Sequence, residues 1–98
     1  MSIKISTGKI YDSVEVIDTI FAMDSHKEGI WSGAADPDKA FAGVKDQLRK
    51  KCEQMGGHGI QDCQFEYRNA VQQGVFGAGK QVIEIFAYGT VVKAAGAI

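Results

Sequence analysis

Two cysteines and one histidine lie close together in the sequence, in the pattern Cys52-x5-His58-x4-Cys63. Thiolate and imidazole groups suit zinc or copper, so these three residues are candidate metal ligands. Tight zinc sites usually carry closer pairs such as C-x2-C, and both cysteines fall at positions typical of a protein core. The pattern therefore favours two buried structural thiols and no cofactor, with zinc or copper binding as the alternative.

The glycine-rich segment from Gly74 to Lys80 satisfies the G-x4-G-K frame of a phosphate-binding loop. That motif needs Ser or Thr at the next position to hold magnesium, and Gln81 stands there instead. It also needs a helix to follow, whereas the residues after Lys80 have the pattern of a strand. We interpret the segment as a hairpin loop.

Three carboxylates, Asp62, Glu66 and Glu84, could line the polar side of a predicted hairpin, where neighbouring carboxylates perturb each other's pKa. The commoner interpretation of such a pattern is a solvated face. With both cysteines buried, no thiol has the exposed, electropositive setting that a nucleophile requires. The sequence thus predicts no catalytic residue and no enzyme, and a small enzyme with its site between protomers is a distant alternative.

Two large aromatic residues fall in segments that should be exposed. Trp31 lies in a connector rich in Gly, Ser and Ala, and Phe76 lies at the tip of the predicted hairpin loop. Exposed aromatic side chains often anchor partners, so both residues are candidate partner-binding residues. The alternative for Trp31 is that it folds over one end of the core.

One segment has the pattern of a helix. Asp36 is a favourable N-cap residue, Pro37 suits the first helical position, and Gly56-Gly57 can provide the left-handed backbone of a C-cap. Between them, apolar residues recur at spacings of three and four and form one stripe: Phe41, Val44, Leu48, Cys52 and Met55. The sequence predicts an amphipathic helix that begins at Pro37.

The remaining patterned segments are strands. Residues 14–22 are rich in β-branched residues, residues 60–69 alternate between apolar and polar, residues 81–93 form the longest strand, and residues 3–6 are a further short one. The order β-β-α-β-β, with the strands separate from one helix, predicts a single α+β domain over residues 1–98. In it, an antiparallel sheet of about four strands carries one amphipathic helix on one face.

Two of these strands are apolar on both faces. In the last strand, Ile83, Ile85 and Val91 oppose Val82, Phe86 and Val92; in the early strand, Ile17 and Phe21 oppose Val14, Val16 and Ile20. One helix covers only one face of a sheet, so the other face needs a cover. A second copy of the chain is the favoured cover, and curling of the sheet into a partial barrel is the alternative.

Composition excludes several other classes of protein. The 98 residues have a formal net charge of −1, which argues against a nucleic-acid partner. The segment Met1-Ser2-Ile3-Lys4-Ile5 lacks the apolar core of a signal peptide, and no apolar run is long enough to span a membrane. We therefore expect a cytoplasmic protein with reduced thiols and no membrane partner.

Three segments in the second part of the chain follow one another in a recognisable pattern: residues 44–55 running into Gly56-Gly57-His58-Gly59-Ile60, then Phe65-Glu66-Tyr67, then Tyr88-Gly89-Thr90-Val91-Val92-Lys93. In this pattern the chain resembles the YbjQ-like family of small bacterial proteins, over about residues 10–93 and most closely over residues 44–93. The resemblance implies a β-β-α-β-β fold and a ring-like homo-oligomer, usually a pentamer. The family has carried a heavy-metal-binding label with no agreed set of ligands.

Two departures limit what the resemblance implies. Gly56-Gly57-His58-Gly59 replaces the small, acidic turn that is usual in the family, and the connector at residues 24–35, which carries Trp31, is shorter and more polar. The leading hypothesis is a non-enzymatic, self-assembling protein of unknown function that presents loops to a partner, an unidentified small ligand or a metal ion. A zinc- or copper-binding protein is the second hypothesis.

Overall fold

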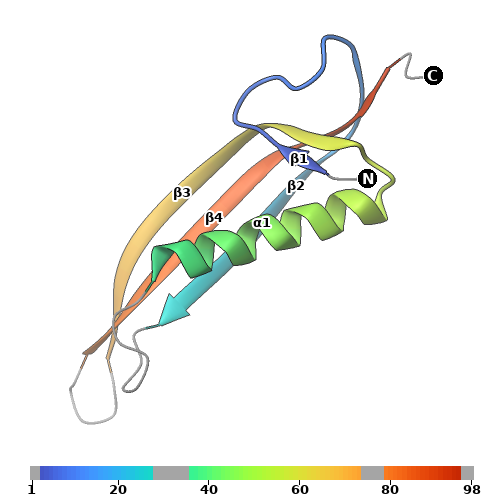
Figure 1. Ribbon diagram of the computed structural model, residues 1–98. Helices are drawn as coiled ribbons and strands as arrows, with labels where there is room; N and C mark the ends of the chain where they lie inside the picture. Colours follow the sequence, from blue (N-terminus) through green and yellow to red (C-terminus); the bar gives the residue numbers. More distant parts are fainter. Residues whose placement is uncertain (1–2, 28–35, 74–78, 96–98) are drawn as a thin grey trace.

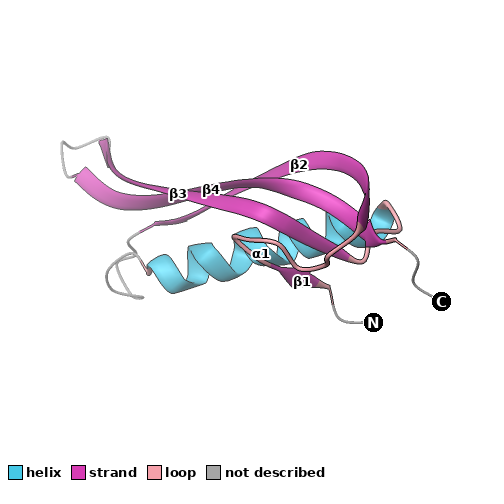
Figure 2. Cartoon of the chain, turned by 90° about the horizontal axis from the view of Figure 1, so that it is seen from above, coloured by secondary structure: helices cyan, strands magenta, loops and turns pink. Residues whose placement is uncertain are grey.

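The computed structural model describes residues 3–27, 36–73 and 79–95, which form one helix packed on one face of a four-stranded sheet (Figures 1 and 2). The elements, in chain order, are β1 (Lys4–Ile5), β2 (Val14–Lys27), α1 (Pro37–Gln54), β3 (Gly59–Gln73) and β4 (Gly79–Ala94). The strand order across the sheet is β1-β3-β4-β2. The α+β class and the β-β-α-β-β order predicted from the sequence are confirmed.

The sheet is mixed, because the short strand β1 runs parallel to β3. The other two pairs, β3 with β4 and β4 with β2, are antiparallel. β2 and α1 both lie between β1 and β3 in the sequence, which gives the chain the long crossover that parallel neighbours need. The expectation of an antiparallel sheet therefore holds for three strands and is wrong for β1.

Local signals set both ends of α1. At the first turn, Asp36 Oδ1 accepts a hydrogen bond from the backbone N–H of Asp38 at 2.9 Å, and Pro37 opens the helix. At the other end, Gly56 has a φ of +74°, and the N–H groups of Gly56 and Gly57 donate to the carbonyls of Glu53 and Cys52. This pair of bonds is a Schellman motif, which satisfies two of the last carbonyls.

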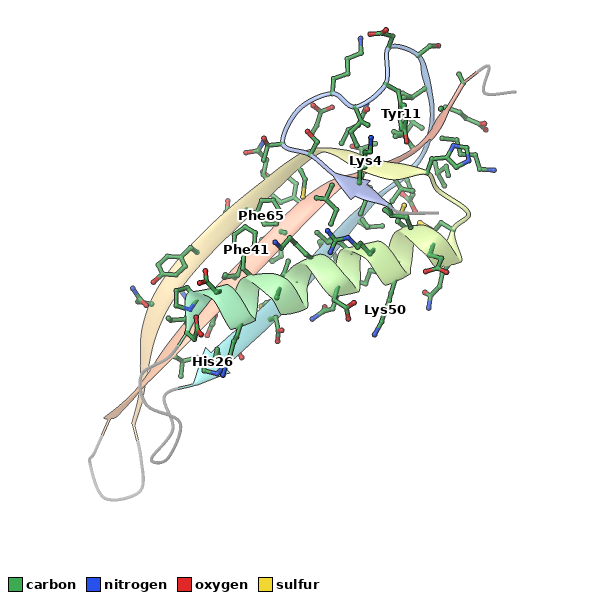
Figure 3. All side chains as sticks on the ribbon, in the orientation of Figure 1. Lys4, Tyr11, His26, Phe41, Lys50 and Phe65 are labelled. Atoms are coloured by element: carbon green, nitrogen blue, oxygen red, sulfur yellow. The ribbon has the colours of Figure 1, made fainter. Side chains whose placement is uncertain are left out.

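The hydrophobic core lies between α1 and the sheet. It consists of Ala40, Val44, Leu48 and Cys52 from the helix and Ile20, Ala22, Ile60, Cys63, Ile83, Ile85, Ala87 and Val91 from the strands. Phe41 stacks on Phe65 at the margin of this core, with 4.6 Å between ring centroids (Figure 3). Met55 was expected to continue the helical stripe, but it is the C-cap residue and is 39% exposed, because the helix ends before it.

A β-bulge changes which residues of β2 share a face. Val16 pairs with Val92 and Asp18 pairs with Val91, so Ile17 is an extra residue in β2. The extra residue reverses the alternation, so Val16 shares the face of Phe21 and Ile20 lies in the core. The expectation that Val14 and Val16 share a face with Ile20 is therefore wrong.

A second bulge lies in β3. Gln61 pairs with Thr90 and Gln64 pairs with Tyr88, so Asp62 and Cys63 together stand opposite one residue of β4. Asp62 has a φ of +53°, in the left-handed region that Asp tolerates better than most residues. As a result Ile60 and Cys63 both enter the core although they are three positions apart.

The long strands make the molecule elongated. Its extents are 59 × 20 × 18 Å and its radius of gyration is 16.6 Å. A compact domain of this length has a radius of gyration of about 13 Å. The chain therefore exposes more surface than a compact domain would. No helix in the described ranges is long and apolar enough to cross a membrane.

Candidate functional site

The side of the sheet turned away from α1, which we call the open face, carries a group of exposed apolar side chains. Val16, Phe21 and Met23 from β2 are 63%, 60% and 59% exposed, and Tyr88 from β4 is 40% exposed. The half-buried Phe86 lies among them, with its ring centroid 5.8 Å from that of Phe21 and 6.1 Å from that of Tyr88. Single exposed apolar residues such as Val16 are normal, but Phe21, Met23, Phe86 and Tyr88 occupy adjacent paired positions and form a contiguous group, which marks an interaction surface.

A shallow groove of about 440 Å³ lies beside this group and has a mixed lining: Met23, Glu66, Tyr67, Arg68, Glu84 and Phe86. Arg68 Nη2 lies 2.7 Å from Glu84 Oε2, and both side chains keep contact with solvent. A second hollow of about 220 Å³ adjoins the groove and shares Met23 and Glu84 with it. The open face thus combines an apolar, aromatic strip with a charged margin, an arrangement that fits a macromolecular surface.

One end of the open face is covered by the chain itself. Position 59 and the side chain of Gln61 face away from α1, because the side chain of Ile60 between them lies in the core. A Cβ built at Gly59 would lie 3.1 Å from Ile10 Cδ1 and 3.6 Å from a ring carbon of Tyr11. Gln61 Oε1 accepts a hydrogen bond from the backbone N–H of Ile10 at 3.2 Å. The connection between β1 and β2 therefore shields this end, and the centre stays exposed.

Two of the three candidate metal ligands are buried thiols, and the third is a half-buried histidine that accepts a backbone hydrogen bond. Cys52 and Cys63 are both free thiols with no solvent exposure, and Cys52 Sγ contacts the Gly59 carbonyl oxygen at 3.7 Å. His58 is half-buried, and its Nδ1 accepts a hydrogen bond from the backbone N–H of Ala94 at 3.0 Å. In the described part of the chain, no three His, Cys, Asp or Glu residues form a group that could hold a metal ion. Metal binding stays a prediction.

Burial raises the pKa of both the Cys52 and Cys63 thiols above the ordinary value of 9.0. The folded state therefore keeps both protons at a pH at which the unfolded state has lost them. Stability should be unaffected by these groups below pH 9 and should fall as the pH rises above it, by about 1.4 kcal/mol per pH unit for each thiol.

Chemical denaturation at pH values between 8 and 11 measures this slope. Lysine and tyrosine side chains also titrate there, so the control is the double variant C52A/C63A, which retains them. We expect a shallower decline in the double variant than in the unmodified chain. Parallel slopes for the two proteins would contradict the prediction.

The candidate carboxylates are only partly brought together. Glu66 and Glu84 both line the groove, while Asp62 is exposed at the bulge in β3 and does not line it. The aromatic residues Trp31 and Phe76, predicted to bind partners, lie outside the described residues.

His26 lies at the end of β2, where its Nδ1 accepts a hydrogen bond from the backbone N–H of Asp36 at 2.8 Å (Figure 3). This hydrogen bond connects the C-terminal end of β2 to the residue that precedes α1. Sequence reasoning also missed Met23 and Tyr88 as exposed residues of the open face. Tyr88 carried a signal, because it shares the alternation of Phe86 and Val92 in the strand predicted at residues 81–93. Met23 carried none, because residues 24–27 after it are all polar.

The fold is similar to that of a solved protein of unknown function. That protein is described as a member of the DUF74 family from Pediococcus pentosaceus, and the two structures match with a TM-score of 0.69. The match has 22% sequence identity and covers 92% of this chain and 95% of the other. No protein-family model and no curated protein matches the sequence. At 22% identity the comparison shows a shared fold.

Proposed function

We propose that the chain is a non-enzymatic binding protein that assembles with copies of itself through the open face of its sheet. The observation that carries this proposal is the exposure of Val16, Phe21, Met23 and Tyr88 on one continuous side of the sheet. Burying such residues releases about 25 cal/mol for each Å² of apolar surface removed from water. A second copy offers the same surface in return, as a two-fold contact requires.

Among the described residues, the solvent side of α1 does not offer a comparable apolar surface. The solvent side of α1 carries charged residues, among them Lys50 and Asp46, whose side chains form an i,i+4 ion pair at 3.2 Å. A helix of a second copy would therefore bring charges onto the aromatic strip, and charged groups are costly to bury there. This favours contact between two open faces over contact between an open face and a helix.

We extend the proposal to membership of the YbjQ-like family. DUF74 is the YbjQ-like family, and the shared fold supports the resemblance carried by the segment from Tyr88 to Lys93. Membership would imply a ring-like oligomer, usually a pentamer, and such a ring needs a head-to-tail contact in addition to the two-fold packing of open faces. The proposal also places the assembly in the cytoplasm, where thiols such as Cys52 and Cys63 stay reduced.

The substitution Met23→Lys tests the assembly surface. Met23 is 59% exposed, so a lysine can reach solvent in the monomer but would be buried against the second copy. We expect light scattering coupled to size-exclusion chromatography to show a smaller particle for this variant at micromolar concentration. The circular dichroism spectrum should be unchanged.

Met55→Lys is the matched control, because Met55 is also exposed but lies at the end of α1. This variant should keep the mass of the unmodified assembly. If the unmodified chain is a monomer at micromolar concentration, or if both variants keep its mass, the open face is not the assembly surface.

A further inference from the structure

The two edges of the sheet differ in how their backbone groups are satisfied. On the β2 edge, side chains bond the outward-pointing groups of alternate residues: Lys51 Nζ donates to the Phe21 carbonyl, Gln47 Nε2 donates to the Met23 carbonyl, Asp18 Oδ1 accepts from the Thr19 N–H, and Asp24 Oδ1 accepts from the Ser25 N–H. Side chains placed in this way occupy the positions that an added strand would need. The β2 edge is therefore blocked.

The β3 edge is open beyond the short strand β1, as Figure 1 shows. β1 pairs only with Gly59 and Ile60, and the backbone N–H of Cys63 then donates to the Ser6 carbonyl. Along an edge strand, the backbone N–H and C=O groups of alternate residues point away from the neighbouring strand. Those of Phe65, Tyr67 and Asn69 therefore point away from β4, toward the free edge of the sheet. Within the described part of the chain, no side chain or backbone group bonds the outward groups of these three residues.

The charged side chains along this open stretch of β3 complement those of the same stretch in a second copy that runs antiparallel to it. In an antiparallel pairing of two β3 strands centred on Tyr67, Glu66 of each copy stands directly opposite Arg68 of the other. Both residues are exposed, and they point to the same face of the sheet. Opposite charges at directly paired positions stabilise antiparallel strands, whereas like charges there are destabilising. Tyr67, which is 55% exposed, would lie on the two-fold axis.

We propose that β3 edges of two copies pair antiparallel about Tyr67, joining two sheets into one continuous sheet. The Tyr67 N–H of each copy donates to the Tyr67 carbonyl of the other, and Phe65 and Asn69 exchange a further pair of hydrogen bonds on each side. This contact is separate from the packing of open faces in the proposed function. It stands if that packing fails.

Cysteine cross-linking tests the pairing. Tyr67→Cys places two thiols at a hydrogen-bonded antiparallel pair, where the Cα atoms lie about 5.5 Å apart and a disulfide can form. Asn69→Cys is the matched control, because the two Asn69 positions lie about 14 Å apart along the paired strands. Under mild oxidation, non-reducing electrophoresis should show a linked dimer for Tyr67→Cys and at least tenfold less for Asn69→Cys. The native thiols are buried and should not react.

A proline provides an independent test. Tyr67→Pro removes the central outward N–H, and proline is tolerated on an edge strand when the missing N–H faces outward. Tyr67→Val keeps that N–H. Sedimentation velocity should show a smaller particle mass for the proline variant than for the valine variant. Equal cross-linking of Tyr67→Cys and Asn69→Cys, or wild-type mass for a folded proline variant, would overturn the proposal.

Discussion

Replacing Leu48 with alanine is expected to lower the free energy of unfolding by about 2–5 kcal/mol, a large part of the stability of a small domain. Leu48 is fully buried at the centre of the contact between α1 and the sheet. Truncation removes apolar atoms from this contact and leaves a cavity that the strands cannot fully close. Urea denaturation followed by circular dichroism measures the loss.

Met55→Ala is the control for this prediction. Met55 continues the same spacing in the sequence, but it is 39% exposed at the C-cap. Its truncation should change the free energy of unfolding by less than about 1 kcal/mol, since it creates no closed cavity. Similar losses for the two variants would mean that the helix packs on the sheet through a different stripe.

Replacing Gly89 with alanine is expected to destabilise the fold by about 1–3 kcal/mol, because the new methyl group has no space. Gly89 lies in β4 opposite the bulge of β3. A Cβ there would lie 2.7 Å from Ile60 Cγ2 and 3.2 Å from both Cα and Cβ of Cys63. Cys63 Cα is backbone and is held by the bulge, so the strand itself must move.

Gly8→Ala is the matched substitution at an open position, where the nearest atom to a new Cβ would be Ser6 Oγ at 4.0 Å. Alanine restricts the unfolded chain at both sites and stabilises by about 0.4–1 kcal/mol where it fits. Thermal denaturation should therefore show a lower midpoint for Gly89→Ala and an equal or higher midpoint for Gly8→Ala. A Gly89→Ala variant as stable as the unmodified chain would show that β3 carries no bulge there.

The helix could be predicted closely because its signals are local. Asp36, Pro37 and Gly56 act on backbone groups within one turn of themselves, and the spacing of Val44 and Leu48 follows from the period of the helix. The same local logic located strands near β2, β3 and β4. The sequence predicted that β2 ends at residue 22, whereas the strand runs to Lys27. The residues that follow Met23 are polar, and nothing in them indicates that they pair with β4.

It was harder to predict which residues share a face of the sheet. A bulge shifts the alternation of a strand by one residue, so the faces can be assigned only if the bulge is known. Ile17 in β2 and Asp62 in β3 each insert one residue, and each insertion depends on the register against β4. Pairing is a contact between distant segments, so its register leaves little trace in either segment alone. This is why Val16 was assigned to the wrong face, while Ile83 and Ile85, on the unbulged strand β4, were assigned correctly.

The sequence by itself determined the caps and stripe of α1, the α+β order, two buried cysteines and a second apolar face on the sheet. Only the tertiary structure decided where that face is exposed. Ile10 and Tyr11 cover one end of it, while Phe21 and Met23 stay exposed. Among the described residues, the β3 edge beyond β1 is left open as well. The physical reason is that caps and periodicity act within a few residues, whereas exposure depends on which distant segment packs against each strand.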